Sequence, residues 1–298
     1  MSAVLRLATP EVALELDPDF GARITGLRDL VTGREWLAQG GRRRMAGEDA
    51  VYGADDAVGW DECFPTVAPW DARATVWGTV LRDHGALWGR PARVVTQAQT
   101  EVVTEQEGPL FTFRRRITLA GRELRADYRL TNRTDVPLPW LWAAHAMLQV
   151  GPDDRILLPG VHEVTAAHLA REGRIVTAPA LAWPGPNPDW PERLDRVQPQ
   201  SAGLAAKLYL DGVPGGAAYV GHGDDWLRIG WSGGIAALGI WLNYGGWPGP
   251  GGSYHLGLEP TNAPVDHLGQ AIGRGTPALA AGSGTGWSLR YTFGARPP

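Results

Sequence analysis

The chain has 298 residues with a formal net charge of −4, a pI near 6.0 and 44% apolar residues, and it contains 40 glycines and 24 prolines. This length allows one large all-β unit or two smaller domains, and the glycine and proline content predicts many turns between short strands. The charge gives no electrostatic support for binding to nucleic acid or to an anionic membrane, and the apolar content excludes a low-complexity chain.

Targeting and redox signals are sparse. Arg6 and Pro10 interrupt the N-terminus before an apolar signal-peptide core develops, and no later stretch has 18 uninterrupted apolar residues. We therefore expect a soluble protein in the cytoplasm with no membrane partner. Cys63 is the only cysteine, so no internal disulfide can form. The 14 tryptophans fit either core packing or stacking on the apolar faces of sugars.

The first third of the chain reads as strands separated by long loops. Residues 11–16 and 22–28 alternate on either side of a turn and predict a hairpin. Residues 39–56 are rich in glycine and charge and predict a long loop. Residues 59–66, which include Asp61, mix acids and aromatics in a turn-prone setting that can carry function. Residues 75–82 are strand-like.

The middle of the chain has its clearest alternation in residues 111–118 and 123–130, which predict two strands. The arginine run at 114–116 is divided between two faces and predicts a solvated face. Residues 138–150 form an apolar run around His145, which taken alone reads as a core histidine. Residues 162–171 are the best helix candidate.

Four prolines exclude regular structure from residues 183–191, which predict a surface loop or a lid carrying two indoles. Further strands are expected at 204–210, 217–220, 226–231, 235–244 and 287–293, with 226–231 and 235–244 paired as a hairpin and 268–275 irregular.

These elements predict an all-β protein, a large antiparallel β-sandwich with few short helices. An alternating βα pattern is absent, which argues against Rossmann and TIM architectures. No linker divides the chain, so we expect a single domain over residues 1–298.

The stretch Ser253–Asn262 is the best candidate for a functional strand. Alternation directs Tyr254, Leu256 and Leu258 into the core and places Glu259 on the opposite face, beside a glycine that leaves room for a ligand. Pro260 is expected to end the strand and fix the carboxylate at its end. The alternative is a solvated glutamate at a sheet edge.

Several segments, in the same order, resemble the aldose 1-epimerase (galactose mutarotase-like) superfamily. Gly21-Ala22-Arg23-Ile24-Thr25-Gly26-Leu27 resembles its glycine-rich strand entry, Cys63-Phe64-Pro65 a turn of its hexose-phosphate branch, and Asp83-His84-Gly85 its His-Gly motif. Asn132 followed by Pro137-Leu138-Pro139-Trp140 and His145 is similar to a further segment, Leu258-Glu259-Pro260 resembles the catalytic strand, and Trp287-Ser288-Leu289-Arg290-Tyr291 resembles the terminal strand. The likeness spans nearly the whole chain.

The resemblance implies a β-supersandwich with a shallow sugar groove, and it transfers three catalytic roles. Glu259 would take the proton from the C1 hydroxyl, His145 would protonate the ring oxygen, and His84 would hold the sugar. Opening a hemiacetal removes one proton and delivers another, which groups that titrate near neutral pH do best. The chemistry requires no cofactor and no metal, and the chain lacks a phosphate-binding glycine loop and a metal-spaced His/Cys cluster.

The chain departs from the family pattern at the residues that would contact the substrate. Trp88 stands where an arginine is frequent, and Arg90 lies two places further on. Lys207 stands where an acid that contacts sugar hydroxyls is expected; it can meet an anionic group on the substrate or be exposed. Trp241 and Asn243 are further candidates for the groove wall, with core packing and a strand-end role as the alternatives.

Three functions fit this pattern. The first is an isomerase of the mutarotase type that interconverts the anomers of an aldose or a close derivative. The second is a non-catalytic carbohydrate-binding protein, and the third is a hexose-phosphate mutarotase with Arg23, Arg90 and Lys207 as phosphate contacts. A metal site in the turn His222-Gly223-Asp224-Asp225 is less favoured, because such turns are usually only turns. Neither the sugar nor the oligomeric state follows from the sequence.

Overall fold

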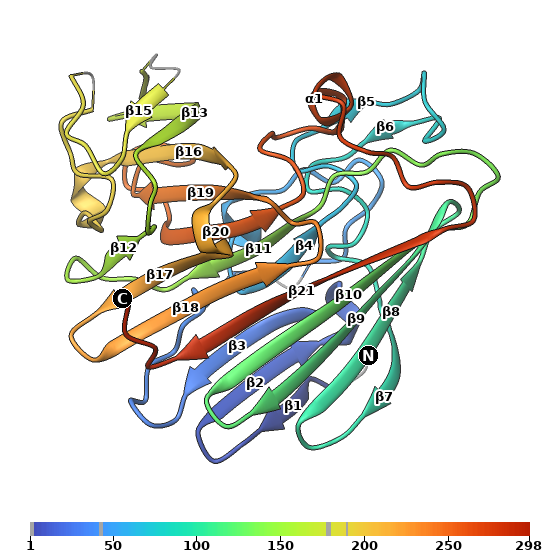
Figure 1. Ribbon diagram of the computed structural model, residues 1–298, viewed down its shortest axis with the longest axis horizontal. Coiled ribbons are helices and arrows are strands. Elements are labelled where there is room, and N and C mark those ends of the chain that lie inside the picture. The colour runs from blue at the N-terminus through green and yellow to red at the C-terminus, as the bar shows by residue number, and fades with distance from the viewer. Residues whose placement is uncertain (1–2, 42–43, 177–179, 189) are drawn as a thin grey trace.

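The computed structural model describes residues 3–41, 44–176, 180–188 and 190–298. Within these ranges the chain forms two large antiparallel sheets that pack face to face, together with a two-stranded ribbon (Figure 1). This arrangement confirms the predicted all-β sandwich. The side chains between the two sheets form the main hydrophobic core.

The larger sheet has eleven strands within the described ranges, in the order β1-β2-β3-β4-β11-β20-β19-β16-β13-β14, with β15 also paired to β13. Its strands are β1 (Leu5–Ala8), β2 (Val12–Asp17), β3 (Arg23–Asp29), β4 (Trp60–Cys63), β11 (Ala143–Leu148), β13 (Glu163–Arg171), β14 (Arg174–Ile175), β15 (Ala180–Ala182), β16 (Leu204–Asp211), β19 (Ala237–Tyr244) and β20 (Tyr254–Thr261).

The second sheet has the order β12-β17-β18-β21-β10-β9-β8-β7. Its strands are β7 (Arg93–Gln97), β8 (Glu101–Glu107), β9 (Phe111–Ala120), β10 (Glu123–Asn132), β12 (Arg155–Leu157), β17 (Ala217–His222), β18 (Asp225–Ser232) and β21 (Gly284–Phe293). The ribbon β5 (Trp70–Asp71) and β6 (Val80–Leu81) lies near the short helix α1 (Leu268–Gly273) at the upper right of Figure 1.

A polar cluster crosses the core between the two sheets. Glu62 of β4 accepts hydrogen bonds from Arg115 of β9 at 2.7 Å, from the Trp142 indole at 2.9 Å and from Tyr128 at 3.0 Å. Burial raises the pKa of Glu62, and the arginine opposes that shift. The predicted solvated face of the arginine run was therefore wrong for Arg115, because alternation directs this residue into the core, where a carboxylate meets it.

The predictions for residues 60–63 and for the hairpin of 226–231 with 235–244 were wrong, because pairing between strands that are distant in sequence decides both. Residues 60–63 form β4 and not a turn, since β4 pairs with both β3 and β11. Residues 226–231 and 235–244 lie in different sheets: β18 pairs with β17 and β21, whereas β19 pairs with β16 and β20. The strand before Pro260 also continues to Thr261.

The helix prediction for residues 162–171 was wrong as well, since these residues form β13, which pairs with β14, β15 and β16. An isolated helix of this length is marginal in water, whereas in β13 the neighbouring strands bond to the backbone groups of these residues. Helix α1 forms in the segment predicted to be irregular. Its His267 side chain accepts from the Gln270 backbone N–H, and the Gln270 side chain accepts from the His267 backbone N–H, each at 3.3 Å, so the two cap its first turn.

The proline-rich segment at 183–191 has no regular structure in its described part, as predicted, and Asp189 lies outside the described residues. Its two indoles do not form a lid, because Trp183 and Trp190 are both buried in the core. Residues 75–82 contribute only the two residues of β6. The long loop predicted over 39–56 is present in its described residues and ends in a short 3-10 turn.

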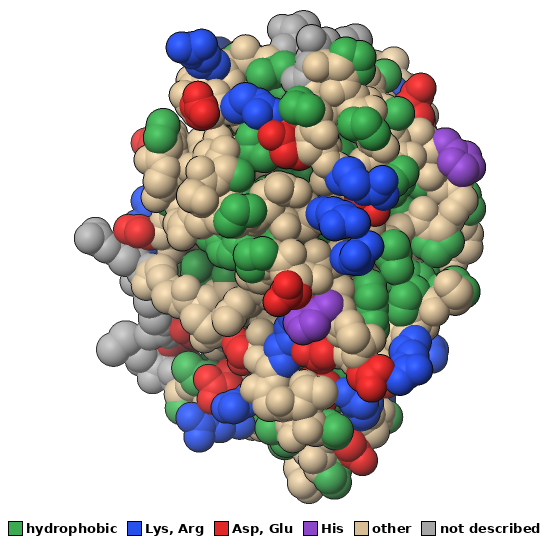
Figure 2. Space-filling model, turned by 90° about the vertical axis from the view of Figure 1, so that its left-hand side faces the viewer, with side chains coloured by type: hydrophobic (Ala, Val, Ile, Leu, Met, Phe, Trp, Pro, Cys, Tyr) green, Lys and Arg blue, Asp and Glu red, His purple; other side chains and the backbone are tan. Residues whose placement is uncertain are grey.

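Acidic and basic side chains are interspersed over the face drawn in Figure 2, apart from one cluster of basic side chains near its centre. This mixture agrees with the small net charge. Among the described residues, no helix combines the length and apolar character that crossing a membrane requires.

Candidate functional site

A cavity of about 290 Å³ lies against the larger sheet. Five of the side chains singled out from the sequence line it, namely His84, His145, Lys207, Trp241 and Glu259. A volume near the lower end of the range of small-molecule pockets, roughly 300 to 1,000 Å³, suits one sugar ring better than an oligosaccharide.

Adjacent strands bring the acid and one histidine together. Strand β11 lies between β4 and β20, and it carries His145 opposite Asp61 of β4. Strand β20 carries Glu259, and the alternation predicted from the sequence holds, since Leu256 and Leu258 are buried on the core face. Because both strands belong to one sheet, their inward-facing polar side chains meet at the same wall of the cavity.

A tight loop delivers His84 from outside the sheet. His84 itself has a φ of 58°, and its backbone N–H donates to Val67 at 2.6 Å. A Cβ on the following Gly85 would lie 2.0 Å from the Phe64 carbonyl oxygen, so only glycine permits the loop to approach the end of β4 this closely. The His84 Nδ1 lies 2.9 Å from the Asp83 carboxylate, which fixes the orientation of the ring.

Tyr52 holds the two imidazoles from the long loop. Its ring stacks on His84 with centroids 3.7 Å apart and meets His145 edge to face at 5.3 Å. Its hydroxyl donates to the Asp56 carbonyl at 2.6 Å and lies 3.4 Å from the His145 Nδ1. The centroids of the two imidazoles are themselves 4.7 Å apart.

Burial lowers the pKa of His145 well below the usual value for histidine, and the neighbouring charge of His84 and then of Lys207 acts in the same direction. The imidazole is therefore neutral at neutral pH. Once protonated, it is a stronger acid than free histidine.

Lys207 is buried and has a partner within the protein, so the structure excludes the alternative that this residue is exposed. It is only 8% exposed, and its ammonium donates to Oε2 of Glu259, which is 1% exposed. The two residues lie on β16 and β20, with β19 between them. Gly239 of β19 makes the contact possible, since a Cβ there would lie 3.3 Å from Glu259 Oε2 and 3.4 Å from Lys207 Nζ. The expectation that Lys207 is exposed was wrong.

The second oxygen of Glu259 is left available. Oε1 is buried and has no hydrogen-bond partner among the described residues. It lies over Gly257, where an added Cβ would be 2.7 Å from it. The room that this glycine provides is therefore used by the carboxylate itself. An unpaired buried acceptor is costly, so Oε1 is suited to meet a donor from a ligand.

Asp266 supplies a further carboxylate at the cavity, from the loop that follows β20. Tyr209, on the cavity face of β16, donates to Asp266 Oδ1 at 2.7 Å. The Tyr209 ring also lies 5.4 Å from the Lys207 ammonium. Asp266 thus lies on the same cavity as the lysine that stands where an acid was expected.

Two indoles form an apolar part of the wall. Trp241 and Trp247 line the cavity and meet edge to face at 6.1 Å. The Trp241 N–H donates to Nε2 of the buried His255 at 3.1 Å, which fixes the plane of the ring. Burial lowers the pKa of His255 to about 4, so this imidazole is a neutral acceptor. His168 of β13 lies beside Trp241 and also lines the cavity.

The other candidate substrate contacts lie away from the cavity wall. Trp88 is fully buried and supports the His84 loop, since its indole donates to the Asp83 carbonyl at 2.7 Å. Asn243 is buried and bonds to the Trp247 backbone at 3.1 and 3.2 Å. Asp61 is paired with Arg23 behind Tyr52, which itself lines the cavity. These three side chains hold the residues that line the cavity.

Arg90 lies at a different cavity, which also contains Arg82 and Gln106. The polar side chains of the turn at 222–225 bond to other residues of the protein. His222 Nδ1 lies 2.8 Å from Asp154, and Asp225 accepts from Arg34 at 3.3 Å.

Sequence reasoning missed Tyr52, Asp83, His168, Tyr209 and Asp266. Tyr209 lies two residues beyond Lys207 on the same strand, so alternation would have placed it on the same face. His168 was hidden by the incorrect helix prediction. Asp266 and Tyr52 lie in loops, whose paths no local pattern predicts.

No family model matches the chain, and no curated protein matches it. Solved structures do resemble it over nearly its full length. Slr1438 protein from Synechocystis sp. PCC 6803 is 16% identical with a TM-score of 0.68, covering 98% of this chain and 96% of that one. A galactose mutarotase related enzyme from Lactobacillus acidophilus is 14% identical with a TM-score of 0.67, covering 98% and 97%. A galactose mutarotase-like protein from Lactobacillus casei ATCC 334 is 15% identical with a TM-score of 0.65, covering 98% and 100%. The chain has the galactose mutarotase-like fold.

Proposed function

We propose that the protein is an isomerase of the aldose 1-epimerase type, which interconverts the α and β anomers of a free aldose or close derivative. The observation that carries the proposal is that Glu259, His145 and His84, distant in sequence, line one cavity of suitable size. The fold and the named structures that share it support a sugar as the ligand.

The geometry supports a distinct role for each group. Oε1 of Glu259, the oxygen that Lys207 leaves free, takes the proton from the C1 hydroxyl. The protonated form of His145, a minority at neutral pH because burial lowers the pKa of this imidazole, gives its proton to the ring oxygen as the bond from C1 to that oxygen breaks. Rotation about C1–C2 and reclosure return both protons and yield the other anomer. His84, held by Asp83, hydrogen-bonds the sugar beside His145.

The remaining walls support recognition of hydroxyl groups and C–H faces. The Asp266 carboxylate is a typical acceptor for sugar hydroxyls and takes the place of the acid expected near position 207. Trp241 and Trp247 offer apolar faces on which a pyranose ring stacks.

The charges favour an uncharged sugar over a sugar phosphate. Of the three cations considered for a phosphate, Arg23 is paired with Asp61 and Lys207 with Glu259, while Arg90 lies at another cavity. To use Arg23 or Lys207 as its counter-charge, a phosphate would have to break a buried ion pair.

The test is the rate of anomer interconversion, followed by polarimetry or saturation-transfer NMR on freshly dissolved aldoses. Glu259→Gln removes the base and should lower the rate at least about 100-fold, which is the lower limit of the rate enhancement that acid–base catalysis usually contributes. Glu163→Gln, on the exposed side of β13, is the matched control and should retain the wild-type rate. Near-normal turnover in Glu259→Gln would remove Glu259 from the mechanism.

The alternative of a binding protein without turnover gives a different result in the same experiment. Sugar would change the tryptophan fluorescence of the wild-type protein, since two indoles line the cavity, while the rate would not exceed that of buffer.

A further inference from the structure

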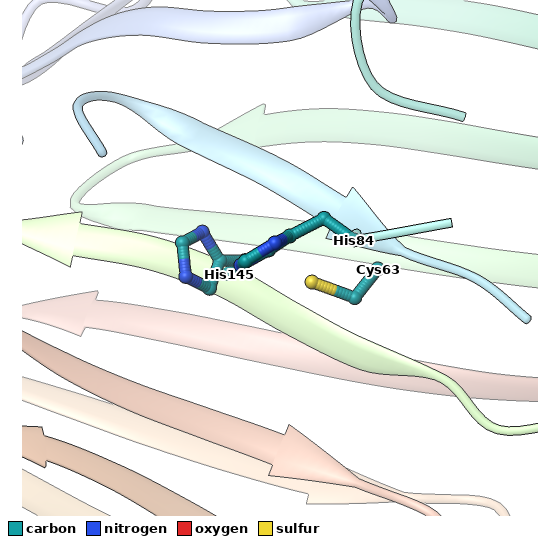
Figure 3. A group of neighbouring side chains, drawn as sticks. All are labelled: Cys63, His84 and His145. Carbon is teal, nitrogen blue, oxygen red and sulfur yellow. The ribbon is translucent and has the colours of Figure 1, made fainter. Parts of the chain in front are cut away.

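A cluster of potential metal ligands is formed by one cysteine and the two imidazoles that line the cavity. Cys63, His84 and His145 each place one ligand atom within 4.8 Å of the others. Figure 3 shows the sulfur of Cys63 pointing toward both rings. The three side chains come from β4, from the loop that follows β6 and from β11, so only the folded chain assembles them.

The donor set matches the preferences of zinc. Thiolate and imidazole are the usual protein ligands of Zn²⁺, at about 2.3 Å and 2.0 to 2.1 Å. A tetrahedral site with those bond lengths separates its ligand atoms by roughly 3.5 Å, so side-chain rotations that close the cluster by about 1 Å are sufficient. Three protein ligands leave a fourth position open, and the cavity lined by His84 and His145 provides the path by which the ion enters.

The groups around the cluster orient the His84 ring as a metal site requires. The Asp83 carboxylate accepts from Nδ1 of His84 at 2.9 Å, which directs the lone pair of the other nitrogen away from Asp83. Carboxylate–histidine pairs of this kind are typical of zinc ligands. Tyr52 stacks on the same ring and restricts its movement.

Cys63 packs at the edge of a small apolar cluster that includes Val67 and Ala143. It is fully buried, and its sulfur makes no hydrogen bond within the part of the chain that the structure describes. A buried cysteine is usually a small apolar side chain. Here one nitrogen of each imidazole lies within 4.8 Å of the sulfur, and the proposed epimerisation does not require a thiol at this position.

We propose that Cys63, His84 and His145 bind one thiophilic divalent cation, with Zn²⁺ the best fit. The ion replaces the thiol proton, so a sulfur–zinc bond forms, one proton is released to solvent and no group is oxidised or reduced. A regulatory consequence rests on the proposed function: because the ion occupies both imidazoles that epimerisation needs, zinc inhibits turnover and competes with the sugar.

The direct test uses the full chain, stripped of metal with a chelator, and Co²⁺ as an optical probe. One Co²⁺ per chain should produce a near-ultraviolet thiolate-to-cobalt charge-transfer band, which Zn²⁺ abolishes by displacement. Cys63→Ser should lose the band. Calorimetric titration should show Zn²⁺ binding weakened about 100-fold or more, since even loss of an outer partner, as in Asp83→Asn, costs about 10- to 100-fold.

His222→Gln is the matched control, because it removes an exposed histidine that lies outside the cluster, and it should leave zinc binding unchanged. His84→Asn provides a second variant if Cys63→Ser does not fold. Absence of the charge-transfer band in the wild-type protein, or unchanged zinc affinity in Cys63→Ser, would overturn the proposal.

Inhibition is measured separately, with each variant's rate expressed relative to its own rate in chelator. Zinc should slow the wild-type protein at concentrations that leave Cys63→Ser unaffected. A cobalt band in a protein that does not catalyse mutarotation would support the metal site and refute the proposed function. Mutarotation by a protein that binds no metal would support the proposed function and refute the metal site.

Discussion

Replacing Lys207 by methionine tests the buried ion pair that organises the cavity. The methionine retains much of the length of the side chain but removes the ammonium that bonds Glu259 Oε2. Oε1 already lacks a partner among the described residues, so the carboxylate would lose its remaining partner while buried. Removing one member of a buried pair usually costs about 3–5 kcal/mol, and we expect Lys207→Met to lower the free energy of unfolding by that amount.

Urea unfolding at pH 7, followed by tryptophan fluorescence, measures this loss. The double variant Lys207→Met with Glu259→Gln should recover more than half of it, because a neutral amide does not require a counter-ion. Arg274→Met is the control, since its ion pair with Asp211 is exposed and should contribute only about 0–1 kcal/mol. A loss below about 1 kcal/mol in Lys207→Met, or a double variant no more stable than the single one, would refute the reasoning.

Two further predictions concern the same sheet. Gly257→Ala places a Cβ 2.7 Å from Glu259 Oε1 and should slow anomer interconversion about 100-fold by displacing the base. Gly26→Ala, whose added Cβ has no contact under 3.6 Å, is the control and should keep the wild-type rate. Equal rates in the two variants would contradict this prediction. His255 has a pKa of about 4 in the folded protein, below that of free histidine. As the pH drops, the unfolded chain therefore binds a proton at this residue before the folded protein does. The free energy of unfolding should fall by about 3 kcal/mol in all between about pH 6.5 and pH 4. His255→Gln, whose amide oxygen can accept from Trp241, should shed that part of the pH dependence in urea unfolding at several pH values, and an unchanged dependence would exclude this residue as its source.

The sequence by itself determined what depends on neighbouring residues. Side chains alternate strictly along a strand, so the faces of residues 111–118 and 123–130 could be read directly and are confirmed. The short strands without βα alternation likewise predicted the all-β architecture. The placement of Glu259 opposite the core-facing leucines followed from the same rule.

Only the tertiary structure decided which strands are neighbours, because backbone pairing is non-local and leaves little trace in a local pattern. It placed β18 and β19 in different sheets and turned residues 163–171 into a strand. It joined Lys207 to Glu259 across Gly239, where a sequence shows only a lysine in a strand.

Loops contributed what no periodicity predicts. Asp266 reaches the cavity from the loop after β20, and Tyr52 reaches it from a glycine-rich segment that carried no site prediction. His84 enters through a left-handed turn whose close approach to β4 depends on Gly85. The chemistry of each side chain is a local property, whereas its partners are set by long-range packing, which is why the residue types were predictable and their meeting point was not.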